Sequence, residues 1–260
     1  MEENNTKVTK PEKKSKLKES TIEIIVAIFL GVTALTTAWA SWIGSLHGGN
    51  QATNYAKSNN LQAEGNSEYN SGVQNLSQDM NLWNSISDLQ LDIWYAQDSG
   101  DEETAEKCQW KMEKLMNDNL TEDFGKVVDW AMQQGGDENG DLVSPFTYVY
   151  EEDAELSDGT KVPAGTSYEE TYFIKANDIL QESNDVLEQG KTDNQNGDTF
   201  NLVTVIYSVV LFMLGIVGTF KRLPNRVIVL GVAIAGFIFA TIFMFTIPMP
   251  TGFDFMGYFK

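Results

Sequence analysis

The sequence predicts an all-α membrane protein, with three transmembrane helices and an extracytoplasmic helical bundle built on a long helical hairpin. Three apolar segments, residues 20–43, 199–220 and 227–248, each have the length of about twenty residues that a helix needs to cross the hydrocarbon core of a bilayer. Basic residues lie before the first segment and between the other two. A long acidic region with helical periodicity, residues 44–198, separates the first segment from the second.

Positive charge sets the predicted orientation. Residues 1–19 are polar and rich in lysine, which predicts a disordered basic tail in the cytoplasm. The short loop 221–226 holds three cations and a proline, and short basic loops also stay in the cytoplasm. Three spans then place residues 44–198 and the C-terminal tail 249–260 outside. We therefore expect a multi-pass protein of the cell (plasma) membrane with its N-terminus in the cytoplasm.

The first span has recognisable ends. Ser20 and Glu23 fit a capping box, in which two side chains satisfy free amides of the first helical turn. Trp39 and Trp42 are expected at the headgroups, where an indole keeps its ring in lipid and its N–H in polar surroundings. Because these tryptophans replace a small-residue cleavage site, we expect the span to be retained and not removed as a signal peptide.

Small residues recur every three or four positions in the spans. Such a stripe lets another helix approach closely, either within the chain or in a second copy. The sequence leaves both possibilities open. The candidate packing residues are Ala27, Gly31, Ala34 and Ala38 in the first span, Gly215 and Gly218 in the second, and Gly231, Ala235 and Gly236 in the third.

The net charge of −19 comes from the region between His47 and Thr199, where acidic residues far outnumber lysines and arginine does not occur. A surface this acidic repels nucleic acid and anionic headgroups, so we expect no nucleic-acid partner. Cys108 and His47 are the only residues of their types. We therefore expect no intrachain disulfide, no cofactor, no metal site and no catalytic residue, and we expect Cys108 to be a buried, inert thiol.

The external region predicts helices separated by glycine. Residues 47–50 (His-Gly-Gly-Asn) predict a break just above the membrane, and residues 51–97 form the next helix. Residues 98–101 end it, and helices over 102–117 and 121–135 follow. Spacings of three and four give the long external helix an apolar seam that needs a partner helix. The seam consists of Tyr69, Val73, Leu76, Met80 and Trp83.

The stretch after the third external helix is irregular. Residues 157–160 predict a turn, and weak alternation over 146–150 favours a small hairpin. Asp137, Asn139 and Asp141 resemble the start of a calcium-binding loop. The glycine and the final glutamate of an EF-hand are missing at the required positions, so we expect a solvated acidic loop.

A last external helix, residues 168–190, is expected to be the antiparallel partner of the seam, because it leads directly toward the second span. Packing against the two shorter helices is the alternative. Residues 191–199 then form a link, and Asp198 or Thr199 is expected to cap the second span.

The order of these elements resembles a group of uncharacterised prokaryotic membrane proteins with an N-terminal span, an external helical region and a C-terminal two-span hairpin. The resemblance rests on TAWASWIGSLHGGNQATNYAKSNNLQAE (residues 37–64), on Ser144–Phe146 and on FNLVTVIYSVVLFMLGIVGTFKR (residues 200–222). Residues 151–165 are longer than the pattern of that group. The resemblance implies the topology; it brings no established function and no site residues.

These observations favour a non-catalytic function. We expect residues 44–198 to be an envelope-facing interaction or assembly domain, with membrane lipid around the spans and a second copy or another protein as partner. The alternative is a small oligomeric channel or transporter component, although the spans hold no internal charge to line a pore. An enzyme is least expected, because acidic pairs such as Glu151 and Glu152 arise by chance in so acidic a chain.

Overall fold

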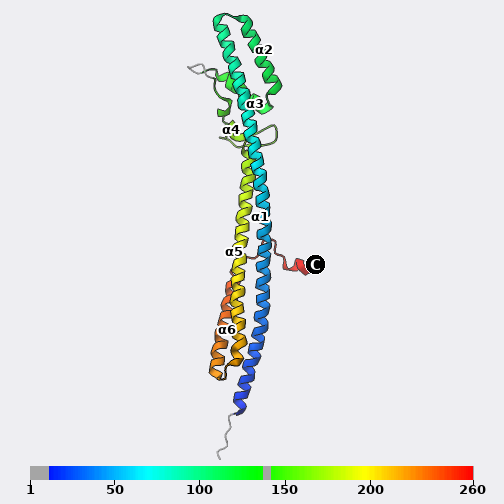
Figure 1. Ribbon diagram of the computed structural model, residues 1–260, viewed down its shortest axis with the longest axis vertical. Helices are drawn as coiled ribbons and strands as arrows, with labels where there is room; N and C mark the ends of the chain where they lie inside the picture. Colours follow the sequence, from blue (N-terminus) through cyan, green and yellow to red (C-terminus); the bar gives the residue numbers. More distant parts are fainter. Residues whose placement is uncertain (1–11, 137–141, 260) are drawn as a thin grey trace, which may run out of the picture. The chain divides into compact units, whose positions relative to one another are not determined.

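The computed structural model describes residues 12–136 and 142–259 and is mostly helical (Figure 1). Its strands are short and form one two-stranded antiparallel sheet. The elements in chain order are α1 (Glu12–Ser99), α2 (Glu102–Asn119), α3 (Glu122–Gln134), η1 (Pro145–Thr147), β1 (Ala154–Glu155), β2 (Lys161–Val162), α4 (Tyr168–Thr171), α5 (Ile174–Ile216), η2 (Val217–Thr219), α6 (Leu223–Met244) and η3 (Phe255–Phe259).

The chain divides into two compact units. Residues 1–56 and 186–260 form the first, here called the span unit, and residues 57–185 form the second, here called the polar unit. Helices α1 and α5 each contribute one part to each unit. Each unit has a core of its own.

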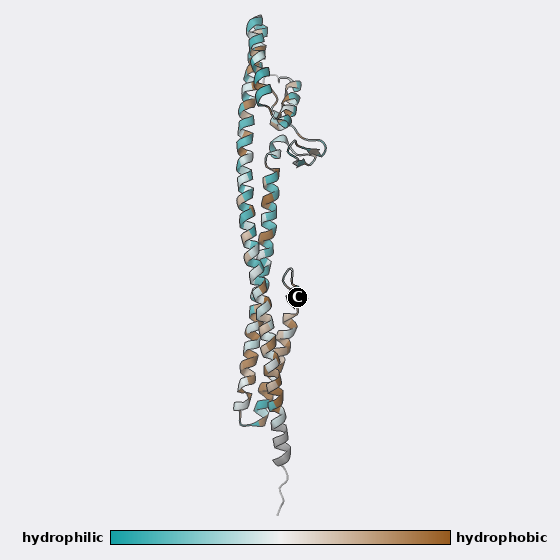
Figure 2. Cartoon of the chain, turned by 90° about the vertical axis from the view of Figure 1, so that its right-hand side faces the viewer, coloured by the Kyte–Doolittle hydropathy of each residue, from teal (hydrophilic) through white to brown (hydrophobic). Residues whose placement is uncertain are grey.

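The span unit is built from α1, α5 and α6, which lie side by side (Figure 1). Each of these helices contains a stretch long and apolar enough to cross a membrane. Figure 2 shows the apolar residues gathered on α6 and on the parts of α1 and α5 beside it. The three apolar helices predicted from the sequence are therefore confirmed.

Large side chains fill the core of the span unit. Tyr207 is completely buried, and its hydroxyl lies 2.9 Å from the hydroxyl of Thr241 on α6. Such contacts matter because lipid provides no hydrophobic drive between helices, so packing and hydrogen bonds hold them together. Around Tyr207 lie Ala40, Ile43, Phe200, Val203, Ala240, Met244 and Ile247, and a second cluster holds Val210, Leu214, Val217, Leu230 and Ala233.

Helix α1 runs without interruption from Glu12 to Ser99. The break predicted at residues 47–50 is therefore wrong, and residues 12–19 of the predicted disordered tail form the first turns of the helix. A glycine costs a helix only about 1 kcal/mol relative to alanine. Ile43 and His47 are buried just before the two glycines, and this packing outweighs the local preference. The tail from residue 12 is rich in lysine and glutamate, which are good helix formers.

Helix α5 likewise continues where a link was predicted. Residues 191–199 are helical, and the Thr199 hydroxyl donates to the Gln195 carbonyl at 2.7 Å and caps no new helix. Asp193, in the middle of this stretch, is 1% exposed. Contacts with α1 therefore hold a helix that the local sequence disfavours.

The predicted end of the long external helix and the predicted bounds of α2 and α3 are confirmed to within two residues, but the helix predicted from residue 168 is interrupted between α4, which ends at Thr171, and α5, which begins at Ile174. Asp101 and Thr121 cap α2 and α3 through hydrogen bonds of 3.1 and 3.3 Å from backbone amides three residues on. Gly100 and Gly135 follow α1 and α3 with φ angles of 76° and 73°, a conformation that favours glycine. Cys108 on α2 is buried, as expected.

Aromatic stacking fixes the irregular part of the polar unit. The ring of Phe124 on α3 lies 5.5 Å from that of Phe146 and 5.9 Å from that of Tyr168. Phe146 is in η1 and not in a strand, whereas Val149, in the same predicted segment, forms an antiparallel bridge with Ser167. The predicted turn at residues 157–160 is confirmed, but the strands that flank it are β1 and β2. Asp137, Asn139 and Asp141 lie outside the described residues.

In the polar unit α5 is the antiparallel partner of α1, as predicted. The predicted seam takes part in the packing, since the Tyr69 ring lies 5.0 Å from that of Phe173, but it does not make the closest approach. Trp83 is buried and Leu76 is half-buried. Tyr69, Val73 and Met80 are 45%, 40% and 48% exposed. The face of closest approach is displaced by one residue along α1 and is formed by small side chains.

These small side chains are Ser58, Gly65 and Gly72, which are buried and spaced seven residues apart. A Cβ atom on Gly72 would lie 2.3 Å from the carbonyl oxygen of Tyr172, and one on Gly65 would lie 2.7 Å from the Leu180 side chain. The heptad spacing is that of a coiled coil. The backbone of α1 can approach the facing segment closely at Gly65 and Gly72, because glycine has no side chain to separate them.

Candidate functional site

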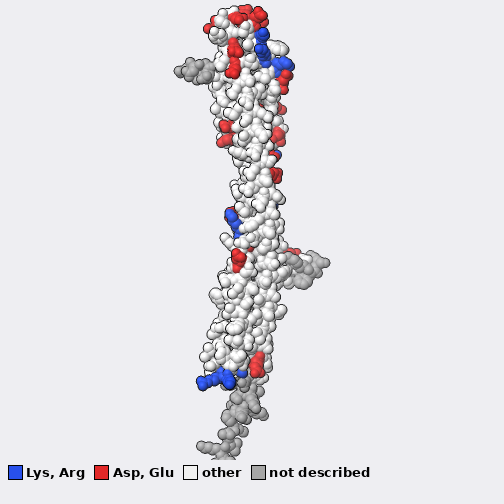
Figure 3. Space-filling model, viewed as in Figure 1, with Lys and Arg blue, Asp and Glu red and all other residues white. Residues whose placement is uncertain are grey.

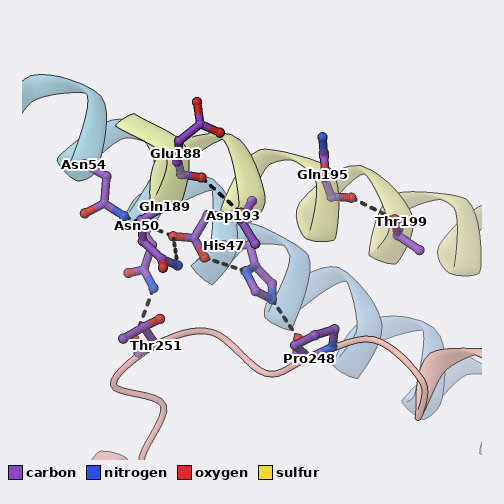
Figure 4. Close-up of polar contacts among 11 residues, drawn as sticks. His47, Asn50, Asn54, Glu188, Gln189, Asp193, Gln195, Thr199, Pro248 and Thr251 are labelled. Atoms are coloured by element: carbon purple, nitrogen blue, oxygen red, sulfur yellow. Dashed lines mark hydrogen bonds and ion pairs between the residues drawn. The ribbon is translucent and has the colours of Figure 1, made fainter. Parts of the chain in front are cut away.

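The single histidine of the chain lies at the meeting point of three segments of the span unit (Figure 4). His47 projects from α1, and its Nδ1 lies 3.0 Å from Oδ1 of Asp193 on α5. Its Nε2 lies 3.1 Å from the carbonyl oxygen of Pro248, which follows α6. Both side chains are 1% exposed. We call this arrangement the His47 clasp.

Two glycines allow α1 and α5 to approach closely at this level. A Cβ atom on Gly44 would lie 3.2 Å from Cβ of Phe200, and one on Gly197 would lie 3.4 Å from the Gly44 carbonyl oxygen. The Phe200 ring stacks on the imidazole, with 5.7 Å between ring centres. The imidazole is therefore held between an aromatic face and a carboxylate.

The second oxygen of the Asp193 carboxylate is also bonded. Asn54 donates to Oδ2 from about two helical turns further along α1, at 3.1 Å, and Gln189 donates to it at 3.5 Å (Figure 4). A buried carboxylate is costly unless donors surround it. Together with the imidazole, these amide donors engage both oxygens of the Asp193 side chain.

The atoms that face the imidazole determine how many protons it needs. A carbonyl oxygen and an ionised carboxylate can only accept hydrogen bonds. Both ring nitrogens of His47 face such oxygens, so both must carry hydrogen for both bonds to form.

The clasp fastens the chain that follows α6, residues 248–255, here called the strap. Asn50 on α1 donates to the Thr251 carbonyl at 3.1 Å. The rings of Phe253 and Phe255 lie 6.3 and 5.5 Å from that of Trp39. The tryptophans predicted at the headgroups are thus the residues on which the strap packs.

The chemistry open to this site follows from its geometry. Each imidazole nitrogen is already engaged, and the ring is closed off from solvent. A general base must reach a substrate proton at hydrogen-bond distance. In this arrangement neither nitrogen of His47 is available as a general base. The contact that the clasp can make or break is the one with the strap.

The polar unit contains a cavity of about 380 Å³ between α1, α3, the hairpin and α5. On its wall the Tyr172 hydroxyl donates to the Asp79 carboxylate. Burial raises the pKa of the Asp79 carboxyl above its usual range, and the hydrogen bond from Tyr172 offsets part of this. Burial also raises the pKa of the Tyr168 and Tyr172 hydroxyls, so both remain protonated donors.

No group of three or more histidine, cysteine, aspartate or glutamate side chains arranged to hold a metal ion occurs within residues 12–136 and 142–259. The acidic side chains that line the cavity have partners of their own. Asp123 accepts from the amide and hydroxyl of Ser157 at 2.8 and 2.6 Å, and Glu68 pairs with Lys175 at 3.0 Å.

The small residues singled out in the spans face outward, with one exception. In the described part of the chain, the Cβ positions of Gly31, Gly215, Gly218 and Gly231 have no neighbouring atom within 4 Å. Gly236 is the exception, with its Cβ position 3.1 Å from Val210. Packing within the chain therefore does not account for the other eight, which are exposed: Ala27, Gly31, Ala34, Ala38, Gly215, Gly218, Gly231 and Ala235.

Sequence reasoning missed the clasp. It placed His47 in a break at residues 47–50, and it placed Asp193 in a link over residues 191–199. The available signal was the register of α1: Gly44, His47, Asn54 and Ser58 continue backwards the spacing of three, four and seven set by Gly65 and Gly72. That register carries no apolar side chains, so a search for an apolar seam passes over it.

The chain matches no protein-family model, and neither a curated protein nor a solved structure is significantly similar to it. The resemblance drawn from the sequence therefore stays a prediction.

Proposed function

We propose that this is an integral membrane protein that acts in assembly, with its N-terminus in the cytoplasm and residues 44–198 as a non-catalytic interaction domain on the external side. Three apolar helices support insertion in a membrane. The expected partners are membrane lipid around the spans and a second copy of this chain or another protein.

The distribution of charge supports this orientation. Lys221 and Arg222 gather at the turn between α5 and α6, where Figure 3 shows a basic end to the span unit. Arg226 donates to the carbonyl oxygens of Phe220 and Gly218 at 2.8 and 3.2 Å and so stabilises this turn. A short basic turn of this kind is retained in the cytoplasm, which directs the acidic region to the other side.

The observation that carries the proposed role in assembly is the outward position of the small residues. Ala27, Gly31, Ala34 and Ala38 form an exposed stripe on α1. In lipid, a stripe of small residues favours a second helix because the backbones can come into van der Waals contact. In the polar unit, the exposed Tyr69, Val73 and Met80 add apolar surface for a partner.

The hydroxyl groups of the spans favour assembly over a channel. Thr36, Thr37, Thr204 and Ser208 each donate to a carbonyl three or four residues earlier in their own helix. Thr33 alone is buried with a hydroxyl that has no partner among the described residues. A pore would need polar groups that remain available to the permeating species.

The mass of the purified protein in a mild detergent or a nanodisc tests the proposal. We expect a defined oligomer that Gly31→Leu or Ala34→Leu reduces in mass, because the larger side chain fills the space that a second helix would use. Val32→Leu is the matched control, since Val32 is also exposed but is already large.

A monomer would end the channel alternative and would move the assembly role to a separate protein bound by residues 44–198. Finding neither self-association nor a retained partner would contradict the proposal.

A further inference from the structure

The His47 clasp connects three segments by hydrogen bonds that depend on a proton. Nδ1 binds α5 through Asp193, and Nε2 binds the strap through the Pro248 carbonyl. Histidine is the side chain whose unperturbed charge change falls between about pH 5 and about pH 8. Loss of one proton would leave one nitrogen with a lone pair directed at an oxygen lone pair.

We propose that the His47–Asp193 pair is a proton-operated clasp: the imidazolium holds the strap against α1, and its deprotonation releases the strap. Asp193 keeps the hydrogen on Nδ1, because the carboxylate is the stronger acceptor. The bond to the Pro248 carbonyl is therefore the one that is lost. The strap then keeps the Asn50–Thr251 bond and its aromatic contacts with Trp39 and Trp42.

Few other charges face this site. On α5 the exposed Glu188 and Lys191 pair with each other at 2.6 Å, and Asp198 is exposed. Asp254, in the strap, is also exposed. By sequence, α1 has no charged residue between Glu23 and Lys57, and α6 has none after Arg226. Asp193 is thus the charged partner bonded to the imidazole.

Release of the strap would expose an aromatic surface, because the strap covers two tryptophans of α1. Phe253 lies 6.3 Å from Trp39 and 5.9 Å from Trp42, measured between ring centres. When the strap leaves, these tryptophans lose their cover. In the orientation proposed above, the clasp responds to the pH of the external medium. Only this choice of side rests on the proposed function; the proton dependence of the strap does not.

The single histidine makes the first measurement direct. Protein labelled with 15N-histidine gives one imidazole in NMR, titrated in nanodiscs from about pH 5 to about pH 8 and beyond. We expect both ring nitrogens to carry hydrogen at the acidic end, and Nε2 to lose its hydrogen first. A bare ring nitrogen at every pH at which the protein is folded would overturn the proposal.

Strap position is followed in the same titration by the distance between spin labels at Thr53→Cys on α1 and Met256→Cys beyond the strap, in a Cys108→Ala background. We expect a narrow distance distribution while the imidazole is charged and a broad one after it is neutral. Because the lost bond involves a charged donor, the ratio of open to closed chains should rise about tenfold or more. An unchanged distribution while the imidazole titrates would overturn the proposal.

Two variants separate the clasp from general loosening. Asp193→Asn removes the charge that favours the imidazolium, so the strap should open at a lower pH than in the wild type. Asn50→Ala removes the neighbouring bond to the strap and keeps the Asp193 charge, so it should raise the open fraction at every pH and shift the imidazole titration no further than the change in strap closure requires. If Asp193→Asn opens at the same pH as the wild type, the clasp is not operated by this pair. These outcomes hold for a monomer or an oligomer, and in either orientation.

Discussion

Two carboxylates with little access to water show how differently this protein treats buried charge. Asp193 is surrounded by donors from His47, Asn54 and Gln189, so both of its oxygens are bonded. Asp79 in the polar unit is half-buried, and the hydrogen bond from Tyr172 offsets only part of the cost of burial. Asp193 thus has more hydrogen-bond donors than Asp79 although it is the more deeply buried of the two.

This difference predicts an effect of pH at Asp79. Its pKa is raised in the folded state, so its contribution to stability is fully present below the pKa of the unfolded chain and is lost as pH rises through the folded value. Asparagine keeps the acceptor for Tyr172 and carries no charge. We expect Asp79→Asn to cost most stability at acid pH and least at neutral pH, measured by denaturant unfolding followed by tryptophan fluorescence.

Asp88→Asn, at an exposed position on the same helix, is the matched control. If the two variants show the same dependence on pH, burial of Asp79 is not the cause.

At the scale of elements, the sequence predicted what local signals determine. The caps at Asp101 and Thr121 and the stop at Gly100 set boundaries that the structure confirms. The predictions failed where contacts between helices override local preference. His47 and Asp193 both lie in segments rich in glycine, asparagine or threonine, and both are held in helices by each other.

The predicted seam does not make the closest approach, for a related reason. Amphipathic reasoning looks for large apolar side chains, but α1 meets α5 through small ones, and a displacement of one residue turns a helix by about 100°. Tyr69, Val73 and Met80 consequently lie on the exposed side. The sequence alone could not predict the candidate site, because Asp193 and Pro248 lie 146 and 201 residues from His47 along the chain.

Close approach of α1 and α5 predicts opposite effects of alanine at different glycines. Gly72→Ala places a methyl group 2.3 Å from a backbone oxygen of Tyr172, which cannot move aside, so we expect a loss of about 1–3 kcal/mol in the free energy of unfolding. Gly48→Ala is the matched control on the same helix, with no described atom within 4 Å. Alanine there should stabilise the helix by about 0.5–1 kcal/mol.

Urea unfolding of the two variants beside the wild type measures both changes. Equal effects at Gly72 and Gly48 would show that helix propensity, and not contact with α5, governs these positions.

At the scale of the whole molecule, the placement of charge is the feature that organises the chain. Acidic residues dominate the sequence between His47 and Thr199, and basic residues lie in the N-terminal tail and at the turn before α6. Between these regions, the apolar parts of α1, α5 and α6 carry no internal charge. Such a pattern specifies an orientation in a membrane without any recognised motif.

The orientation is tested by labelling single cysteines, in a Cys108→Ala background, in intact cells whose plasma membrane is directly accessible to the reagent from the medium. We expect an impermeant maleimide to label Glu103→Cys on α2 directly, because the acidic region faces outward. Asn225→Cys at the basic turn should be labelled only after the membrane is permeabilised. Both positions are exposed in the folded chain, so burial does not account for a difference between them. The reverse pattern would invert the topology and would place the His47 clasp in contact with the cytoplasm.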